Sequence, residues 1–88
     1  MTIFYSATFG RQYRKLAAEL KNHVVTKERI FRANPFDSRL RTHKLHGQFD
    51  GLFSFSVNAK CRIIFGFEGD EKSAVRFHAI GTHDIYEH

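Results

Sequence analysis

The chain has 88 residues, which favours a single domain over residues 1–88, because two smaller units would each bury too little apolar surface. Its formal charge is +5 with the histidines counted as neutral, which fits a polyanionic or acidic partner and equally a solvated basic surface that serves solubility. The longest apolar run is Ile63-Ile64-Phe65 and the only cysteine is Cys61, which excludes a membrane span and an internal disulfide. We therefore expect a cytoplasmic protein whose core depends on ten phenylalanines.

The N-terminal part predicts a strand followed by two helices. Residues 2–6 are β-prone, and Ser6 or Thr8 can cap the helix that follows. Apolar residues then recur with helical spacing on one face, namely Phe9, Tyr13, Leu16, Ala17 and Leu20. Asn22-His23 suggests an interruption before a second helix of about ten residues, which ends before Pro35. The two segments are expected to form a helical hairpin.

The C-terminal part predicts three strands, because the apolar period changes to two from Leu52 onward. The strands are expected over 52–58, 61–68 and 73–80, with a hairpin turn at Glu68-Gly69-Asp70-Glu71. The resulting order, β-α-α-β-β-β, predicts an α+β domain in which an antiparallel sheet carries the helical hairpin on one face. The other face is expected to be partly polar and open, and chemistry would take place there.

The faces of single residues can also be predicted. Strict alternation in the last strand assigns Val75, Phe77 and Ala79 to one face and Arg76, His78 and Ile80 to the other. Phe36 and Leu40 are expected to anchor the loop after the helices, and Cys61 is expected to be a small core residue.

Three stretches could contribute to an active site: 43–47 with two histidines, 60–65 with Lys60 and Arg62, and 76–86, which ends in Thr-His-Asp-Ile-Tyr. Histidine titrates near pH 6.5 and suits both proton-transfer roles, while a guanidinium can bind two phosphate oxygens. These are the groups that metal-free RNA cleavage requires. The H-x-x-H pattern in 43–47 lies in a glycine-containing loop without a cluster of cysteines or carboxylates, so neither a metal nor a cofactor is expected.

These segments together resemble a known family. The element order and the stretches His-Lys-Leu-His-Gly, Phe-Ser-Phe-Ser-Val-Asn, Cys-Arg-Ile-Ile-Phe and Gly-Thr-His-Asp-Ile-Tyr resemble the RelE/ParE superfamily of type II toxin–antitoxin toxins, closest to the YafQ and RelE branches. The resemblance covers nearly the whole chain, and residues 43–86 carry most of it. It implies a RelE-like fold and an mRNA interferase that works in the ribosomal A site. In that family the ribose 2′-hydroxyl attacks the adjacent phosphate, leaving a 2′,3′-cyclic phosphate.

The resemblance also implies partners. A cognate antitoxin protein is expected to neutralise the toxin, and operator DNA is expected to be bound only in complex with that antitoxin. The substrate would be mRNA in the ribosomal A site, with no metal, cofactor or membrane involved.

Carried over by position, the resemblance assigns catalytic roles to four residues. His83 matches the C-terminal histidine of the YafQ type and would act as general acid, and Arg62 matches the arginine that holds the scissile phosphate. His43 matches a YafQ-branch histidine and is a candidate general base, while Tyr86 approximates the C-terminal tyrosine of RelE. Further substrate contacts are expected from Lys44, His46, Lys60 and Arg76. Each of the four residues has a structural role as its alternative. His83 would cap a strand end, and Arg62 would form an ion pair across the sheet. His43 would be a surface histidine, and Tyr86 would pack on the sheet.

The chain also departs from the family pattern. Phe53 and Phe55 stand where RelE has two catalytic lysines, Ser56 where YafQ has a histidine, and Lys60 where YafQ has an aspartate. Two other functions therefore stay open on the same fold: a ParE-like toxin that poisons DNA gyrase, and a catalytically silent homologue that only binds antitoxin and operator.

Overall fold

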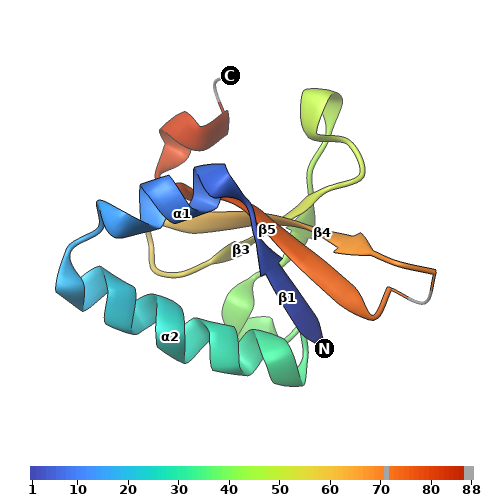
Figure 1. Cartoon of the computed structure of the whole chain (residues 1–88), viewed down its shortest axis with the longest axis horizontal. Coiled ribbons are helices and arrows are strands. Elements are labelled where there is room, and N and C mark those ends of the chain that lie inside the picture. The colour runs from blue at the N-terminus through green and yellow to red at the C-terminus, as the bar shows by residue number, and fades with distance from the viewer. Residues whose placement is uncertain (71, 87–88) are drawn as a thin grey trace.

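The computed structural model describes residues 1–70 and 72–86 (Figure 1). In these residues the sheet contains β1 (Thr2–Tyr5), β2 (His43–Lys44), β3 (Phe53–Ser56), β4 (Arg62–Glu68) and β5 (Ala74–Gly81). The helices are α1 (Ala7–Arg14) and α2 (Ala18–Ala33), and the short 3₁₀ helices are η1 (Ser38–Leu40), η2 (Gly47–Phe49) and η3 (His83–Tyr86). None of the helices in the described ranges is long and apolar enough to cross a bilayer.

The predicted α+β architecture is confirmed, with the strands in the order β1-β5-β4-β3-β2. The predicted antiparallel meander is β3, β4 and β5, while β1 pairs with β5 in parallel. Two parallel strands must be joined by a crossover connection. Between β1 and β5 this connection begins with α1 and α2, which pack on the sheet (Figure 1). The sequence did not predict β2, which is short and adds His43-Lys44 to the edge of β3.

The helical hairpin forms with a different break from the predicted one. Ser6 caps α1 as expected, its Oγ accepting from the amide of Phe9 at 2.9 Å. The first helix then ends at Arg14, and the second runs as one element of 16 residues from Ala18, through Asn22-His23. The predicted interruption there was wrong because Leu20 and Val24 pack on the core on either side of it, and packing outweighs the weak helix propensity of asparagine and histidine.

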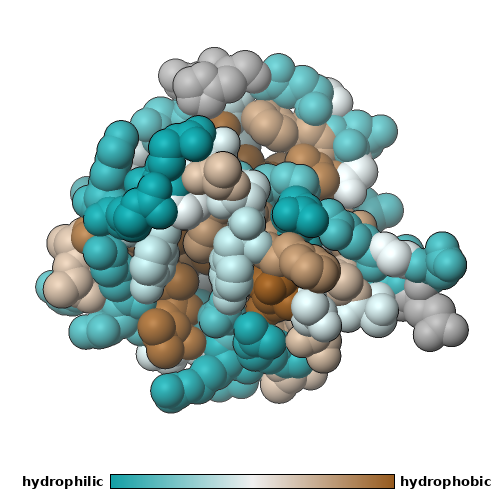
Figure 2. Space-filling model, in the orientation of Figure 1, coloured by the Kyte–Doolittle hydropathy of each residue, from teal (hydrophilic) through white to brown (hydrophobic). Residues whose placement is uncertain are grey.

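The core is a group of stacked and edge-on phenylalanines under α2. Phe31 is fully buried, and its ring centroid lies 4.9 Å from that of Phe55 and 4.8 Å from that of Phe65. Leu40 is also fully buried, as predicted, whereas Phe36 is 55% exposed and was wrongly expected to be an anchor. Phe36 instead lies at the rim, against other aromatic rings of the sheet. On the face seen in Figure 2, hydrophilic residues predominate and hydrophobic residues show between them.

A bulge in β5 overturns the predicted alternation. Phe65 pairs with Phe77 but the preceding Ile64 pairs with Ala79, so His78 is an extra residue in the ladder. Ile80, which was predicted to lie on the face opposite Phe77, is therefore 1% exposed in the core. The bulge brings the end of β5 into register with the start of β4, which determines where the C-terminal segment leaves the sheet.

The predicted hairpin turn between β4 and β5 is present, with Gly69 at a φ of 85°. Glu71, which was assigned to that turn, lies outside the described residues. At its other end β5 leads into η3, which contacts η2. Gln48 Nε2 donates to the carbonyl of Tyr86 at 3.3 Å, and the rings of Phe49 and Tyr86 meet edge-on, 6.0 Å apart. These two contacts connect the segment after β2 to the segment after β5.

Candidate functional site

A cleft of about 350 Å³ lies where β4 begins and β5 ends. It is lined by Ala59, Lys60, Arg62, Thr82, His83 and Tyr86. Arg62 and Gly81 are direct partners across the two strands, so the turn before β4 and the 3₁₀ helix after β5 face each other there. The structure thereby brings together two predicted catalytic side chains of η3 and one of β4.

Arg62 lines this cleft and is held in place by β3. It is the first residue of β4 and pairs with Ser56, to whose Oγ its Nη1 donates a hydrogen bond. Within residues 1–70 and 72–86 no carboxylate forms an ion pair with Arg62, so the alternative of a structural ion pair is not observed. A guanidinium has five N–H donors, and the bond to Ser56 uses one, which leaves others for an anion.

His83 and Tyr86 are presented by η3, with their ring centroids 6.1 Å apart and tilted by 56°. Ile85 anchors this short helix because it is only 6% exposed, and its amide donates to the carbonyl of Thr82 at 3.1 Å. The hydroxyl of Thr82 donates to Asp84 Oδ1 at 2.8 Å, which closes the turn. His83 is exposed and lines the cleft.

His43 lies on β2 opposite Ser54 of β3, two residues along that strand from Ser56, the partner of Arg62. Its Nε2 is 3.4 Å from Ser54 Oγ, and its Nδ1 is 3.3 Å from the carbonyl oxygen of Arg41. Both contacts are satisfied if Nδ1 carries the proton and Nε2 accepts from the hydroxyl. Ser54 is fully buried, so this histidine satisfies a buried polar group and ties the edge strand to β3. The structure places His43 beside the cleft and outside its lining.

The other predicted contact residues lie at different distances from the cleft. Lys60 lines it, whereas Lys44 is exposed on β2 and His46 is exposed just before η2. Arg76 is not brought to the cleft. It lies near the opposite end of β5, where its Nε donates to Glu68 Oε1 at 2.6 Å and its guanidinium lies 5.3 Å from the ring centroid of Phe4.

A second cleft, of about 360 Å³, adjoins the first and was not predicted from the sequence. Its lining consists of Lys27, Arg39, Arg41, Ser56, Asn58, Ala59 and Arg62. The basic residues of this cleft come from α2, η1 and β4, and nothing in their spacing along the chain links them. In the described part of the chain, no group of three or more histidine, cysteine or carboxylate side chains could hold a metal ion.

No family model matches the chain, and no curated protein matches its sequence. Solved structures do match. A YoeB/ParE toxin from Agrobacterium tumefaciens superposes with a TM-score of 0.80 at 16% identity, over 94% of this chain and 99% of that one. YafQ from E. coli matches with a TM-score of 0.74 at 22% identity, over 96% and 94% of the two chains.

A third match is to the RelBE2 toxin–antitoxin complex from Mycobacterium tuberculosis, with a TM-score of 0.68 at 21% identity, over 93% and 96% of the chains. Similarity at these identities reports on architecture. The fold implied by the sequence resemblance is thus confirmed: this chain has the fold of the RelE/ParE-type toxins.

Proposed function

We propose that the chain is the toxin of a type II toxin–antitoxin system and that it cleaves mRNA on the ribosome without a metal ion. The observation that carries this proposal is that one cleft contains Lys60, Arg62, His83 and Tyr86. These residues offer two cations for a phosphate, one imidazole that can transfer a proton and one aromatic ring for a base. The fold shared with YafQ and RelBE2 supports the same reading.

In the proposed reaction the ribose 2′-oxygen attacks the adjacent phosphorus, and the bond from phosphorus to the 5′-oxygen breaks. Arg62 and Lys60 bind the non-bridging oxygens, on which negative charge accumulates in the transition state. Protonated His83 donates its proton to the leaving 5′-oxygen, and neutral His43 accepts the proton of the 2′-hydroxyl. Tyr86 stacks on the unpaired base beside the scissile bond. The products are a 2′,3′-cyclic phosphate and a 5′-hydroxyl.

The proposal includes a cognate antitoxin that covers the toxin and blocks its activity, with operator DNA bound only by the pair. Solved complexes of proteins with this fold support such a partner, since one is the DinJ–YafQ complex from E. coli and another is RelBE2. Co-expression with the antitoxin is expected to restore growth.

The test is primer extension on translated mRNA after induction of the wild type and of His83→Ala. Cuts at ribosome positions are expected with the wild type and not with the variant. His23→Ala is the matched control, because His23 is an exposed histidine on α2 that lines neither basic cleft, and it is expected to cut like the wild type. Growth arrest without cuts would favour gyrase as the target, and normal growth without cuts would favour a silent homologue.

A further inference from the structure

The second cleft shares Ala59 and Arg62 with the first and continues it toward α2 and η1. We infer that it binds a second phosphate of the RNA strand, next to the scissile one, and that Arg41 is its principal ligand. This inference rests on the proposed function, because it extends the path of the same substrate. It concerns binding of the strand and not the chemical step.

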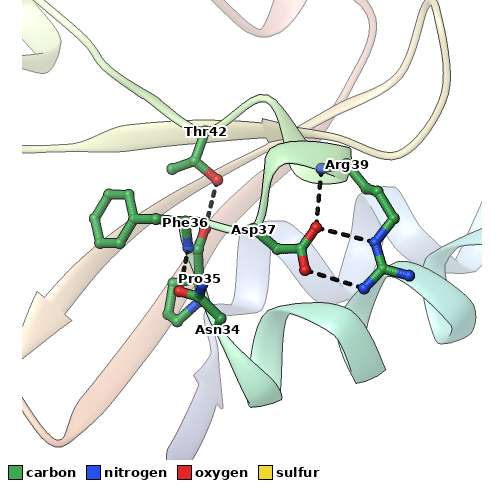
Figure 3. A network of polar contacts seen from close by, with 6 residues as sticks. All are labelled: Asn34, Pro35, Phe36, Asp37, Arg39 and Thr42. Atoms are coloured by element: carbon green, nitrogen blue, oxygen red, sulfur yellow. Dashed lines mark hydrogen bonds and ion pairs between the residues drawn. The ribbon is translucent and has the colours of Figure 1, made fainter.

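The charges lining the second cleft favour an anion. The side chain of Arg39 is already paired, with its Nε and Nη2 each 3.0 Å from an oxygen of Asp37 (Figure 3). Within the described ranges, neither Arg41 nor Lys27 forms an ion pair, and no carboxylate contributes to the lining. In the part of the chain that the structure describes, Lys27, Arg41 and Arg62 thus form no ion pair with a carboxylate. The pKa of Asp37 is lowered mainly by its hydrogen bonds to Arg39, and the charge of Lys27 contributes to lowering it.

The backbone at Arg41 allows its side chain to be removed without disturbing the loop. Arg41 has a φ of 53° and a ψ of 43°, the left-handed conformation that glycine adopts freely and that residues with a Cβ adopt at a cost. The loop imposes this conformation: Thr42 Oγ1 donates to the carbonyl of Pro35 at 2.5 Å, as Figure 3 shows, and the amide of Arg41 donates to the carbonyl of Ser38. Glycine suits this backbone better than arginine does, so Arg41→Gly removes the side chain without straining the loop.

Arg62 connects the two clefts. It lines both, and its partner Ser56 also lines the second one, so the guanidinium is located on the boundary between them. A single RNA strand carries a phosphate at every nucleotide. A strand whose scissile phosphate lies at Arg62 and His83 can therefore place a neighbouring phosphate among Arg41 and Lys27.

The test compares two glycine substitutions at left-handed positions. Arg41→Gly removes the inferred ligand, and Lys72→Gly removes the same charge from a residue that also has a φ of 53°. Lys72 is exposed in the β4–β5 turn, at the end of β4 opposite Arg62. Both variants are made in the His83→Ala background so that the RNA stays intact, and glycine suits the backbone at both positions.

The measurement is fluorescence anisotropy of a short single-stranded RNA over a range of salt concentrations. Arg41→Gly is expected to weaken binding about tenfold at low salt, as for one charge-assisted hydrogen bond to phosphate. It should also lower the slope of log K against log salt by about 0.7, which corresponds to one lost phosphate contact on a single strand. Lys72→Gly is expected to change neither value beyond a small, general loss of attraction.

Equal affinities and equal salt slopes for the two variants would overturn the inference. Cleavage by the protein with an intact His83 is measured in parallel, so that the two proposals can fail separately. If that protein does not cut mRNA but Arg41→Gly still weakens RNA binding, the second phosphate site stands and the cleavage proposal fails. If it cuts mRNA and Arg41→Gly binds like Lys72→Gly, the cleavage proposal stands and the second site fails.

Discussion

Single hydrogen bonds determine how the predicted site residues are presented. Arg62 is oriented by the hydroxyl of Ser56, its partner on the neighbouring strand. His43 is oriented in the same way by Ser54 and by the carbonyl of Arg41. As a base, His43 must exchange the 3.4 Å contact with Ser54 for the substrate hydroxyl, and at that length the hydrogen bond is weak.

The role of His43 can be separated into proton transfer and positioning by two substitutions. Asparagine can keep a hydrogen bond to the Arg41 carbonyl but cannot accept a proton, whereas alanine does neither. If His43 is the base, both His43→Asn and His43→Ala should lower kcat by about 10²–10⁴-fold and remove the acidic limb of the pH–rate profile. Cleavage by His43→Asn at the wild-type rate, with His43→Ala impaired, would instead show that the histidine only positions β2 and Arg41.

The elements around the cleft depend on the bulge at the end of β5. Because His78 is extra in the ladder, Ile80 turns into the core and Gly81 pairs with Arg62. The chain then turns tightly from β5 into η3. Glycine at position 81 is required by close packing, since a Cβ there would overlap Ile85 Cγ2.

Gly81→Ala is therefore expected to displace η3 while leaving His83 and Tyr86 in the sequence. Overpacking of this kind costs about 1–3 kcal/mol, so Tm should fall, and cleavage should be lost with the displaced ring of His83. Gly10→Ala is the matched control. A Cβ there meets only the flexible end of Arg14 at 3.4 Å, and alanine in a helix is favoured over glycine by about 0.5–1 kcal/mol.

Thermal melts and cleavage assays on both variants test this account. The control should keep its cleavage, and its Tm should stay the same or rise slightly. Full cleavage by Gly81→Ala would contradict the role assigned to the β5–η3 turn.

Across the whole molecule, β1 and α2 are joined by a contact that is sensitive to pH. Tyr5 on β1 donates its hydroxyl to Glu28 Oε1 at 2.5 Å, and its ring lies against Phe9 and Phe77. Burial, followed by the hydrogen bond to Glu28 and its charge, raises the pKa of Tyr5 from 10.0 to about 12. The folded state therefore favours the neutral phenol, and the associated stabilisation is complete below pH 10 and is lost as the pH rises from 10 to about 12.

Tyr5→Phe keeps the ring and removes the titrating group. As the pH rises from 10 to about 12, the wild type is expected to lose Tm faster than Tyr5→Phe, although other groups titrate in both proteins. Glu28→Gln keeps an acceptor but removes the charge, so its pH dependence should lie between those two. Parallel curves of Tm against pH for the wild type and Tyr5→Phe would contradict the assignment.

Local chemistry in the sequence determined those features that depend on neighbouring residues along the chain. The period of two in 53–57 predicted β3, Ser6 predicted the start of α1, and Gly69 predicted the turn after β4. Each depends on residues only a few positions apart, so its signal can be read directly. The stretch Gly-Thr-His-Asp-Ile-Tyr likewise marked His83 and Tyr86 as candidate site residues, and both line the first cleft.

The tertiary structure alone decided register and the gathering of distant residues. The pairing of β4 with β5 places Ile80 in the core, although strict alternation of side chains predicted the opposite face. Core packing keeps α2 continuous across Asn22-His23. Lys27, Arg41 and Arg62 are far apart in the sequence, and only the folding of the chain makes them line one cleft. Such arrangements depend on how well surfaces far apart in the chain fit together, and no local periodicity encodes that fit.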